Sequence, residues 1–418
     1  MISEANDGNK AWLDRPKLRP VEVIPIQTRD GEGIGLRDPS RISPQTLLFS
    51  RAAAAVLALF DGTNDLRDVQ AAIQRGYGEL VGIEVIEGLV RALDENHFLE
   101  GQTFDRFFER ELAEFEAAPI RPAMLAGQAY AGQPEALAEE LESYGRDREK
   151  GPLLDAPPRG LVAPHIDFQR GGPCYARAYE CLDPESPPAL VVILGTAHNP
   201  VRGPLVLCAK DFETPFGPAR CESGLAAEMS ARIGPDLTAE AFVHRGEHSV
   251  EFQAVWLKHR FPKDHGPLIL PFLTASFFPL MAAGRSPMES PPFEGALAII
   301  RALLQEWARA NGPVMILASV DLSHVGPQFG DQFPVSAAVR DDVRSYDLQL
   351  LDQAARGDHE AFYQTVAGAR DRTHVCGLAS IYTMLRLIDE PAGRLLDYDQ
   401  WIDPNGQGLV SFSSMVFP

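Results

Sequence analysis

The sequence has few cysteines, too few basic residues to balance its acidic ones, and no long apolar run. Its five cysteines are an odd number with no CxxC pair, so they indicate no disulfide framework. Lys and Arg number 38 against 58 Asp and Glu, for a net charge of -20. Nucleic acids and anionic membranes attract basic surfaces, so we expect neither as a partner. The longest apolar runs, ALVVILG and PLILPFL, are far shorter than the ~20 residues that span a bilayer.

The first residues, MISEANDGNKAWLDRPKLRP, lack the apolar segment of a secretory signal. Together with the cysteine usage, this predicts a cytoplasmic protein. The length of 418 residues exceeds one ordinary domain, and 45% apolar with 23% charged residues indicates globular structure.

Residues 1–101 are predicted to form a small α+β domain. Short β-type runs flank Asp30-Gly31, a hairpin signal. Helical patterns follow: one opened by Ser43-Pro44, one over 66–73, and one over 83–96 with Val85, Leu89 and Leu93 on its apolar face. The arrangement resembles a winged helix of the peptide-binding PqqD type, and the acidic charge favours peptide or protein over DNA. A packing domain without a ligand is the alternative. Residues 102–119 are expected to form a connecting helix.

Residues 120–418 repeat one theme, a short apolar run followed by small and polar residues. The runs are RGLVAPHIDFQRGG, ALVVILGTAHNP, PLILPFLTAS and PVMILASVDLSHVG, with helical stretches such as FEGALAIIRALLQEWARA between them. Apolar runs of this kind are typical of parallel strands covered on both faces. We therefore predict an α/β sheet flanked by helices.

Three of the four runs carry a histidine just past the apolar part: His165, His198 and His324. Reactive groups in such sheets gather at the carboxyl ends of the strands, so we expect these side chains to lie close together. Taken singly, each could instead be a structural histidine bonded to a neighbouring loop.

Asp321 and His324 are three residues apart and are expected to form one carboxylate–imidazole pair that suits acid–base chemistry. The alternative for Asp321 is a helix cap. His248, at the mouth of a predicted helix, faces the cleft or is a surface or capping residue. Glu251 in the same first turn is expected to be a dipole-complementing cap. His244 is expected at the surface.

Cys376 directly precedes the helical stretch GLASIYTMLRLI. A helix N-terminus stabilises a thiolate, which makes Cys376 a candidate metal ligand or nucleophile. The alternative is an inert buried cysteine, the role we assign to the other four.

From Arg121 onward the chain resembles the Memo family, which includes the bacterial proteins called AmmeMemoRadiSam system protein B. The resemblance is carried, in order, by RPAMLAGQAYAGQPEALAEEL, PHIDFQRGG, LGTAHNP, TPFGPARCE, GEHSVEFQAVWL, SVDLSH, HVCGLASI and SFSSMVF. It implies the fold of class III extradiol ring-cleaving dioxygenases.

The resemblance also implies a metal pocket formed by His165, His198 and Cys376. Asp321 and His324 would line this pocket, and His248 and Glu247 would lie at its edge. His324, Asp321 and His248 are then the candidate catalytic residues.

Two imidazoles and a thiolate suit Fe(II), copper or zinc. The first hypothesis is a non-haem iron or copper redox enzyme, dioxygenase-like, that acts on a small organic or peptide-borne substrate. Zinc-dependent hydrolysis is a further hypothesis. The alternative from another class is a non-catalytic peptide-binding protein that serves radical SAM and AMMECR-type partner proteins, as the bacterial family name implies.

Overall fold

The computed structural model describes residues 11–28, 31–78, 80–146, 154, 156–262 and 266–418. The chain divides into two compact units, Met1–Ala118 and Pro119–Pro418. Residues 1–10, on which part of the signal-sequence prediction rests, lie outside the described residues. No helix in the described ranges is both long and apolar enough to cross a membrane.

The first unit contains a three-stranded antiparallel sheet in the order β1-β2-β3. Its strands are β1 (Glu22–Thr28), β2 (Gly31–Arg37) and β3 (Thr46–Ser50). The predicted hairpin is confirmed by the pairing of β1 with β2, although Asp30 of its turn lies outside the described residues. The helices are α1 (Ala11–Asp14), α2 (Arg51–Leu57), α3 (Leu66–Tyr77), α4 (Ile83–Glu95) and α5 (Gln102–Ala117). The expected connecting helix, α5, belongs to this unit.

Two details of the predicted helices are wrong. The first helix does not begin at Ser43-Pro44, because residues 46–50 pair with β2 and Ser50 caps the helix through the backbone N–H of Ala53. On α4 the side chain of Val85 is exposed. The buried residues of α4 are Ile86, Val90 and the predicted Leu93, and the predicted Leu89 packs partly buried against the same core. The winged-helix assignment stays a prediction.

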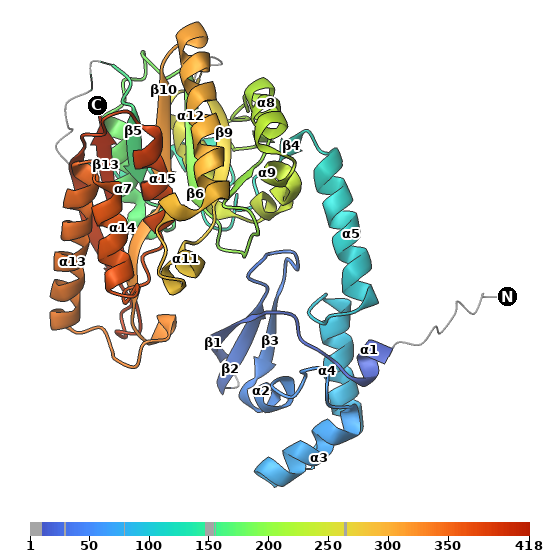
Figure 1. Ribbon diagram of the computed structural model, residues 1–418. Helices are drawn as coiled ribbons and strands as arrows, with labels where there is room; N and C mark the ends of the chain where they lie inside the picture. Colours follow the sequence, from blue (N-terminus) through green and yellow to red (C-terminus); the bar gives the residue numbers. More distant parts are fainter. Residues whose placement is uncertain (1–10, 29–30, 79, 147–153, 155, 263–265) are drawn as a thin grey trace. The chain divides into compact units, whose positions relative to one another are not determined.

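The second unit is built on an eight-stranded sheet with the strand order β11-β13-β5-β10-β6-β9-β7, and β12 pairs with β13 (Figure 1). Its strands are β5 (Gly160–Ala163), β6 (Leu190–Thr196), β7 (Leu205–Leu207), β9 (Leu268–Thr274), β10 (Val314–Ser319), β11 (Asp321–Val325), β12 (Arg394–Ile402) and β13 (Leu409–Phe417). The short strands β4 (Ile120–Arg121) and β8 (Asp211–Phe212) form a separate pair. The four predicted apolar runs supply β5, β10, β6 and β9, which are parallel neighbours.

Helices cover both faces of this sheet. α7 and α10 pack on one face, and α13 and α15 pack on the other, where α12 lies beside α15 (Figure 1). The helices are α6 (Pro134–Ser143), α7 (Phe168–Glu180), α8 (Ser223–Ile233), α9 (Asp236–Ala239), α10 (His248–Arg260), α11 (Phe278–Ala282), α12 (Pro291–Asn311), α13 (Ala337–Ala355), α14 (His359–Gly368) and α15 (Leu378–Leu387). Among the described residues, 3-10 turns span Ala241–Arg245, Pro287–Glu289 and Pro327–Phe329. The predicted α/β sheet flanked by helices is confirmed.

The central strands are apolar up to their last residues because both of their faces are covered. All four residues of β5 and the first six of β6 are buried. Consecutive side chains alternate between the two helical layers, so each strand contributes to both cores. The polar residues that follow these strands therefore emerge at one edge of a rigid scaffold.

Candidate functional site

His165 and Cys376 meet at the carboxyl edge of the sheet. His165 follows β5 and is 2% exposed, and Cys376 directly precedes Gly377, the N-cap residue of α15. The Sγ atom of Cys376 lies 3.3 Å from His165 Nε2 and 3.8 Å from His198 Nε2. His198 follows β6, and β10 separates β5 from β6 in the sheet. The fold thus brings together the three residues that the resemblance proposed as ligands.

Glu247 organises the other side of this group. Its carboxylate lies 3.0 Å from His198 Nδ1 and 3.1 Å from His248 Nδ1. It also accepts the backbone N–H groups of His198, His248 and Ser249, and so caps α10. One buried carboxylate therefore holds two imidazoles and the start of a helix.

The tautomers of His165 and His198 follow from their partners. His165 Nδ1 lies 3.0 Å from the carbonyl oxygen of Ser319, which can only accept, so Nδ1 carries the proton. The same reasoning applies to His198 Nδ1 beside the Glu247 carboxylate. In the neutral form of each ring Nε2 is left with its lone pair, and both Nε2 atoms lie next to Cys376 Sγ. This arrangement is typical of histidine ligands held by a second hydrogen bond.

His248 joins the group as a third imidazole. Ring nitrogens of His165, His198 and His248 lie within 4.8 Å of one another. The centroids of the His198 and His248 rings are 4.7 Å apart, with the rings stacked. The sequence placed His248 at the edge of the pocket, whereas the structure places it among the candidate ligands.

Asp321 and His324 do not form the expected pair. No hydrogen bond joins their side chains in the described part of the chain. Asp321 accepts the backbone N–H groups of His165 and Ile166, and its Oδ2 lies 3.6 Å from His165 Nε2. A bulge in β11 turns Asp321 and His324 toward the same face of the sheet. Asp321 nevertheless bonds to the loop after β5, because two backbone donors satisfy a buried carboxylate there.

His324 has a separate environment. Its Nδ1 lies 3.2 Å from the carbonyl oxygen of Leu322, and its ring lies edge-on to Phe329. Its carbonyl oxygen lies 3.0 Å from His374 Nδ1, which ties β11 to the segment that carries Cys376. His324 thus supports the cysteine loop through its backbone.

The cysteine loop is held against the strand ends by its backbone. The N–H of Cys376 donates to the carbonyl oxygen of Leu322 at 3.0 Å. A Cβ added to Gly377 would lie 2.7 Å from the carbonyl oxygen of Asp321 and from Val320 Cβ. Glycine therefore permits the close approach of α15 that places the thiol.

Burial and neighbouring charges shift several pKa values in opposite directions. Burial, and then the nearby His198 and His248, hold the pKa of His165 well below its ordinary value. Burial also lowers the pKa of His198, but the Glu247 carboxylate and the contacts with Cys376 outweigh it and raise that pKa well above 6.5. Burial raises the pKa of Asp321 to about 7 and lowers the pKa of His324 to about 4.

The donor atoms fit a metal ion. Metal–sulfur and metal–nitrogen bonds of about 2.3 and 2.0–2.1 Å at tetrahedral angles imply sulfur–nitrogen separations of about 3.5 Å. The observed separations of 3.3 and 3.8 Å agree with this value. His165, His198 and Cys376 would supply imidazole and thiolate ligands, and His248 lies within reach as a further imidazole.

A small cavity adjoins the Cys376 side of this group. It has a volume of about 180 Å³, and its lining includes Cys376, Thr196, Ser276, Phe277 and Met281. The Thr196 hydroxyl oxygen is buried and has no hydrogen-bond partner among the described residues. The cavity therefore combines an apolar wall with an unsatisfied polar atom close to the candidate ligands.

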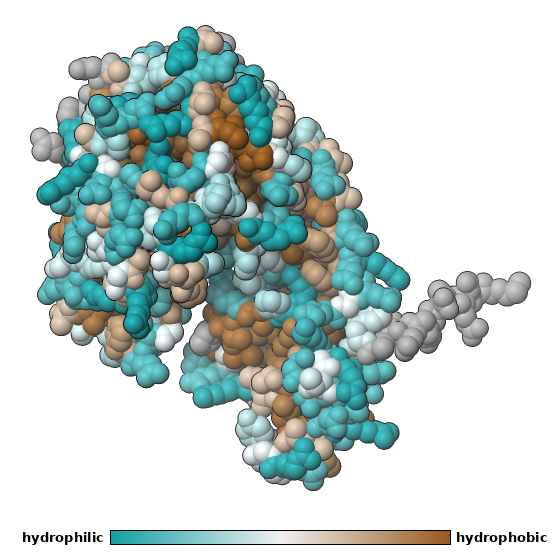
Figure 2. Space-filling model, viewed as in Figure 1, coloured by the Kyte–Doolittle hydropathy of each residue, from teal (hydrophilic) through white to brown (hydrophobic). Residues whose placement is uncertain are grey.

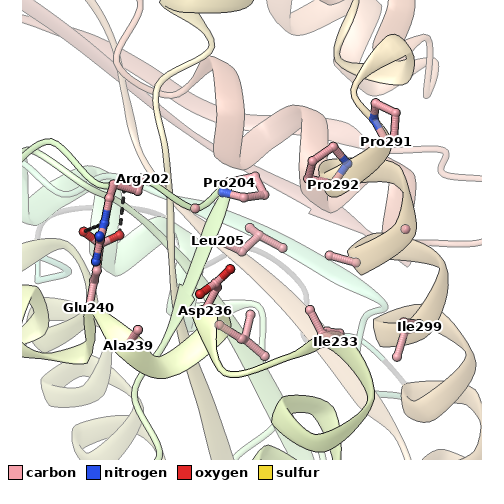
Figure 3. A pocket seen from close by; sticks show the side chains of 14 residues that line it. Arg202, Pro204, Leu205, Ile233, Asp236, Ala239, Glu240, Pro291, Pro292 and Ile299 are labelled. Carbon is pink, nitrogen blue, oxygen red and sulfur yellow. Dashed lines mark hydrogen bonds and ion pairs between the residues drawn. The ribbon is translucent and has the colours of Figure 1, made fainter.

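A larger cavity of about 570 Å³ lies elsewhere in the second unit. Pro204, Leu205, Ile233, Asp236 and Pro292 are among its lining residues (Figure 3). Apolar side chains reach the surface between α8 and α12 on this face (Figure 2). None of the predicted site residues lines this cavity, so its size does not make it the site of the chemistry.

Several supporting residues were missed or misjudged from the sequence. Ser319 was not singled out, although its carbonyl oxygen orients His165. Gln253 donates to the Pro164 carbonyl oxygen and to the Ser319 hydroxyl, both at 2.7 Å. Glu251 lies in the first turn of α10 as expected, but the sequence did not show that it is fully buried and paired with Arg121. His244 is also fully buried, against the Val206 carbonyl oxygen. For Glu251 and Gln253 the available signal was that both are polar residues in the otherwise apolar helical segment EFQAVWL.

The fold and the site define an α/β protein with a cluster of histidines and a cysteine at the carboxyl edge of its sheet. Residues 121–416 match the family model described as "Memo: Memo-like protein". The chain belongs to the Memo family, as the sequence motifs predicted.

One relative extends the similarity over nearly the whole chain. A MEMO1 family protein of Aquifex aeolicus is 28% identical over 407 residues, covering 96% of this chain and 100% of its own length. This match extends into the first unit, since 96% of the chain cannot lie within residues 121–416. A MEMO1 family protein of Thermus thermophilus is 30% identical and covers 79% of this chain and 92% of its own length. One of Methanopyrus kandleri is 26% identical and covers 71% of this chain and 98% of its own length.

Proposed function

We propose that this Memo family protein is a non-haem iron or copper redox enzyme whose metal is held by His165, His198 and Cys376. The observation that carries the proposal is the convergence of the Nε2 atoms of His165 and His198 on the Cys376 thiol. Each imidazole is locked by a second hydrogen bond, to Ser319 and to Glu247. A thiolate with two imidazoles favours a soft or borderline metal over magnesium or calcium. A bound iron or copper would supply one-electron chemistry and a site for dioxygen.

Two residues beside the ligands handle protons in this proposal. Asp321 has a carboxyl pKa of about 7, raised by burial, so near neutral pH it can both hold and release a proton at the oxygen 3.6 Å from His165. His324, whose pKa burial lowers to about 4, is neutral at pH 7 and can act only as a weak base. Each acts separately, because no bond joins the two side chains in the described residues.

The substrate in this proposal is a small organic group that occupies the cavity beside Cys376. The volume of about 180 Å³ admits a small molecule or a single side chain of a peptide. Phe277 and Met281 offer apolar contact, and the Thr196 hydroxyl offers a hydrogen bond to a polar atom of the substrate.

Metal content of anaerobically purified protein tests the proposal. We expect about one iron or copper per chain, and loss of that metal in Cys376→Ala. Cys221→Ala is the matched control, because Cys221 lies beside the Cys208 carbonyl oxygen and away from the three histidines. Dioxygen uptake with a reductant should follow the metal content across these variants.

Other results would redirect the proposal. Zinc at one per chain, with an activity that needs no oxygen, would replace it by metal-dependent hydrolysis. Absence of metal from folded wild-type protein would favour the peptide-binding alternative with a radical SAM partner.

A further inference from the structure

Arg121 is fully buried in the second unit, and three of the residues it contacts, His244, Glu247 and Glu251, lie far from it in sequence. Its guanidinium donates to the carbonyl oxygens of His244 at 3.0 Å and Glu247 at 2.9 Å. It also donates to the Pro122 carbonyl oxygen at 2.7 Å and to the Glu251 carboxylate. The Arg121 side chain therefore bonds to His244 before α10, to the N-cap residue Glu247, and to Glu251 in the first turn of that helix.

Glu251 is held from its other side by residues that follow Arg121. Its Oε1 accepts the N–H of Leu125 at 2.9 Å and the hydroxyl of Tyr130 at 2.5 Å. Its Oε2 accepts the N–H of Met124 at 3.2 Å besides the guanidinium. A carboxylate has about four lone-pair directions, and all are used here. The segment around 121–130 and the start of α10 thus form one hydrogen-bonded block.

We infer that Arg121 is a positioning residue for the metal site, acting through Glu247. The guanidinium fixes the backbone of Glu247, and the side chain of Glu247 fixes His198 and His248. Arginine suits this task because its planar fork presents five N–H donors in fixed directions, which the single ammonium of lysine cannot reproduce. The expected effect on metal binding rests on the proposed metal site. The hydrogen bonds between Arg121 and Glu247, and between Glu247 and the two histidines, exist without metal.

The test compares three variants of the full chain. Arg121→Lys keeps the charge and removes the fork, and Tyr130→Phe removes one hydroxyl donor to Glu251. Arg386→Lys is the matched control, because Arg386 forms a two-pronged pair with Glu294, at 2.8 and 2.9 Å, on the helices α15 and α12. The first readout is Zn²⁺ affinity by competition titration, and the second is the imidazole ¹H–¹⁵N signals of His198 and His248 in metal-free protein.

Arg121→Lys should bind Zn²⁺ about 10- to 100-fold more weakly, the usual effect of losing a residue that orients a ligand, and should move both imidazole signals. Tyr130→Phe should weaken binding by a smaller factor. Arg386→Lys should change thermal stability alone. Wild-type affinity and unchanged imidazole signals in folded Arg121→Lys would overturn the inference.

The same variants also give an answer if Arg121→Lys does not fold or if wild-type protein binds no Zn²⁺. If Arg121→Lys does not fold, Tyr130→Phe decides: moved signals support the inference, and wild-type signals with wild-type affinity overturn it. If wild-type protein binds no Zn²⁺, the proposed metal site fails, and the imidazole signals of the metal-free variants still decide whether Arg121 positions Glu247.

Discussion

Cys376 Sγ lies 3.3 Å from His165 Nε2, although 211 residues separate them in sequence. The contact is made by two elements that approach the same strand ends from different sides. His165 comes off β5, and Cys376 comes off the loop that leads into α15. The sheet therefore brings the site residues together, and each residue that holds them in place can be tested separately.

Glu247→Gln should weaken metal binding by about 10- to 100-fold. The carboxylate accepts from two imidazoles and from three backbone N–H groups, whereas a glutamine amide offers only one acceptor oxygen. The pKa of His198 should also fall, because the carboxylate is the main group that raises it against burial. Titration with Zn²⁺ and histidine NMR measure both effects. Glu240→Gln, which affects the exposed pair with Arg202, should leave both unchanged.

Asp347→Asn should change how stability depends on pH. Asp347 is fully buried and accepts the hydroxyls of Ser323 and Tyr398, and burial raises its pKa to about 6. A raised carboxyl pKa stabilises the fold below the unfolded value of 3.8, and this contribution is lost as the pH rises through about 6. Between pH 4 and pH 7 the unfolding free energy of the variant should therefore gain about 2 kcal/mol relative to wild type.

Urea denaturation at both pH values checks this prediction. Asp352→Asn on the same helix is the control, because Asp352 is exposed and paired with Arg356. An equal pH response of the two variants would show that Asp347 is charged at no cost in the folded protein.

Gly377→Ala should destabilise the second unit and displace the thiol. The added methyl group would lie 2.7 Å from a backbone oxygen and from Val320 Cβ, and overpacking of this kind costs about 1–3 kcal/mol. Gly295→Ala is the control: it lies inside α12 with nothing within 4 Å of the added Cβ, and it should stabilise by roughly 0.5–1 kcal/mol. Thermal unfolding measures the change in stability, and Zn²⁺ titration measures the displacement of the thiol. Equal metal affinity in both would show that α15 can shift without moving Cys376.

A chain of residues 119–418 should fold alone and keep the metal site. All candidate ligands and their supports lie in this unit, which is compact by itself. The Methanopyrus kandleri relative aligns over 98% of its length with only 71% of this chain, which is about the size of this unit. Circular dichroism and metal analysis of the fragment check the expectation. A fragment that folds but binds no metal would assign the first unit a part in the site.

The sequence by itself determined the class of fold and most of the site. Apolar runs without alternation predict strands covered on both faces, and those strands are β5, β6, β9 and β10. Histidines directly after two of these runs had to emerge at the same edge, because parallel strands end together. The local sequence pattern predicts less reliably where pairing with a distant segment competes with it. Residues 46–50 are an example, since they pair with β2 although a helix was expected there.

Only the tertiary structure decided how the site is held together. The order of the strands, with β10 between β5 and β6, puts Ser319 beside His165. The bonds of Glu247 to two histidines and of Arg121 to Glu247 join segments far apart in the chain. The separation of Asp321 from His324 arises because backbone donors of another loop satisfy the carboxylate first. Hydrogen bonds between distant segments depend on packing, and no spacing along the sequence encodes them.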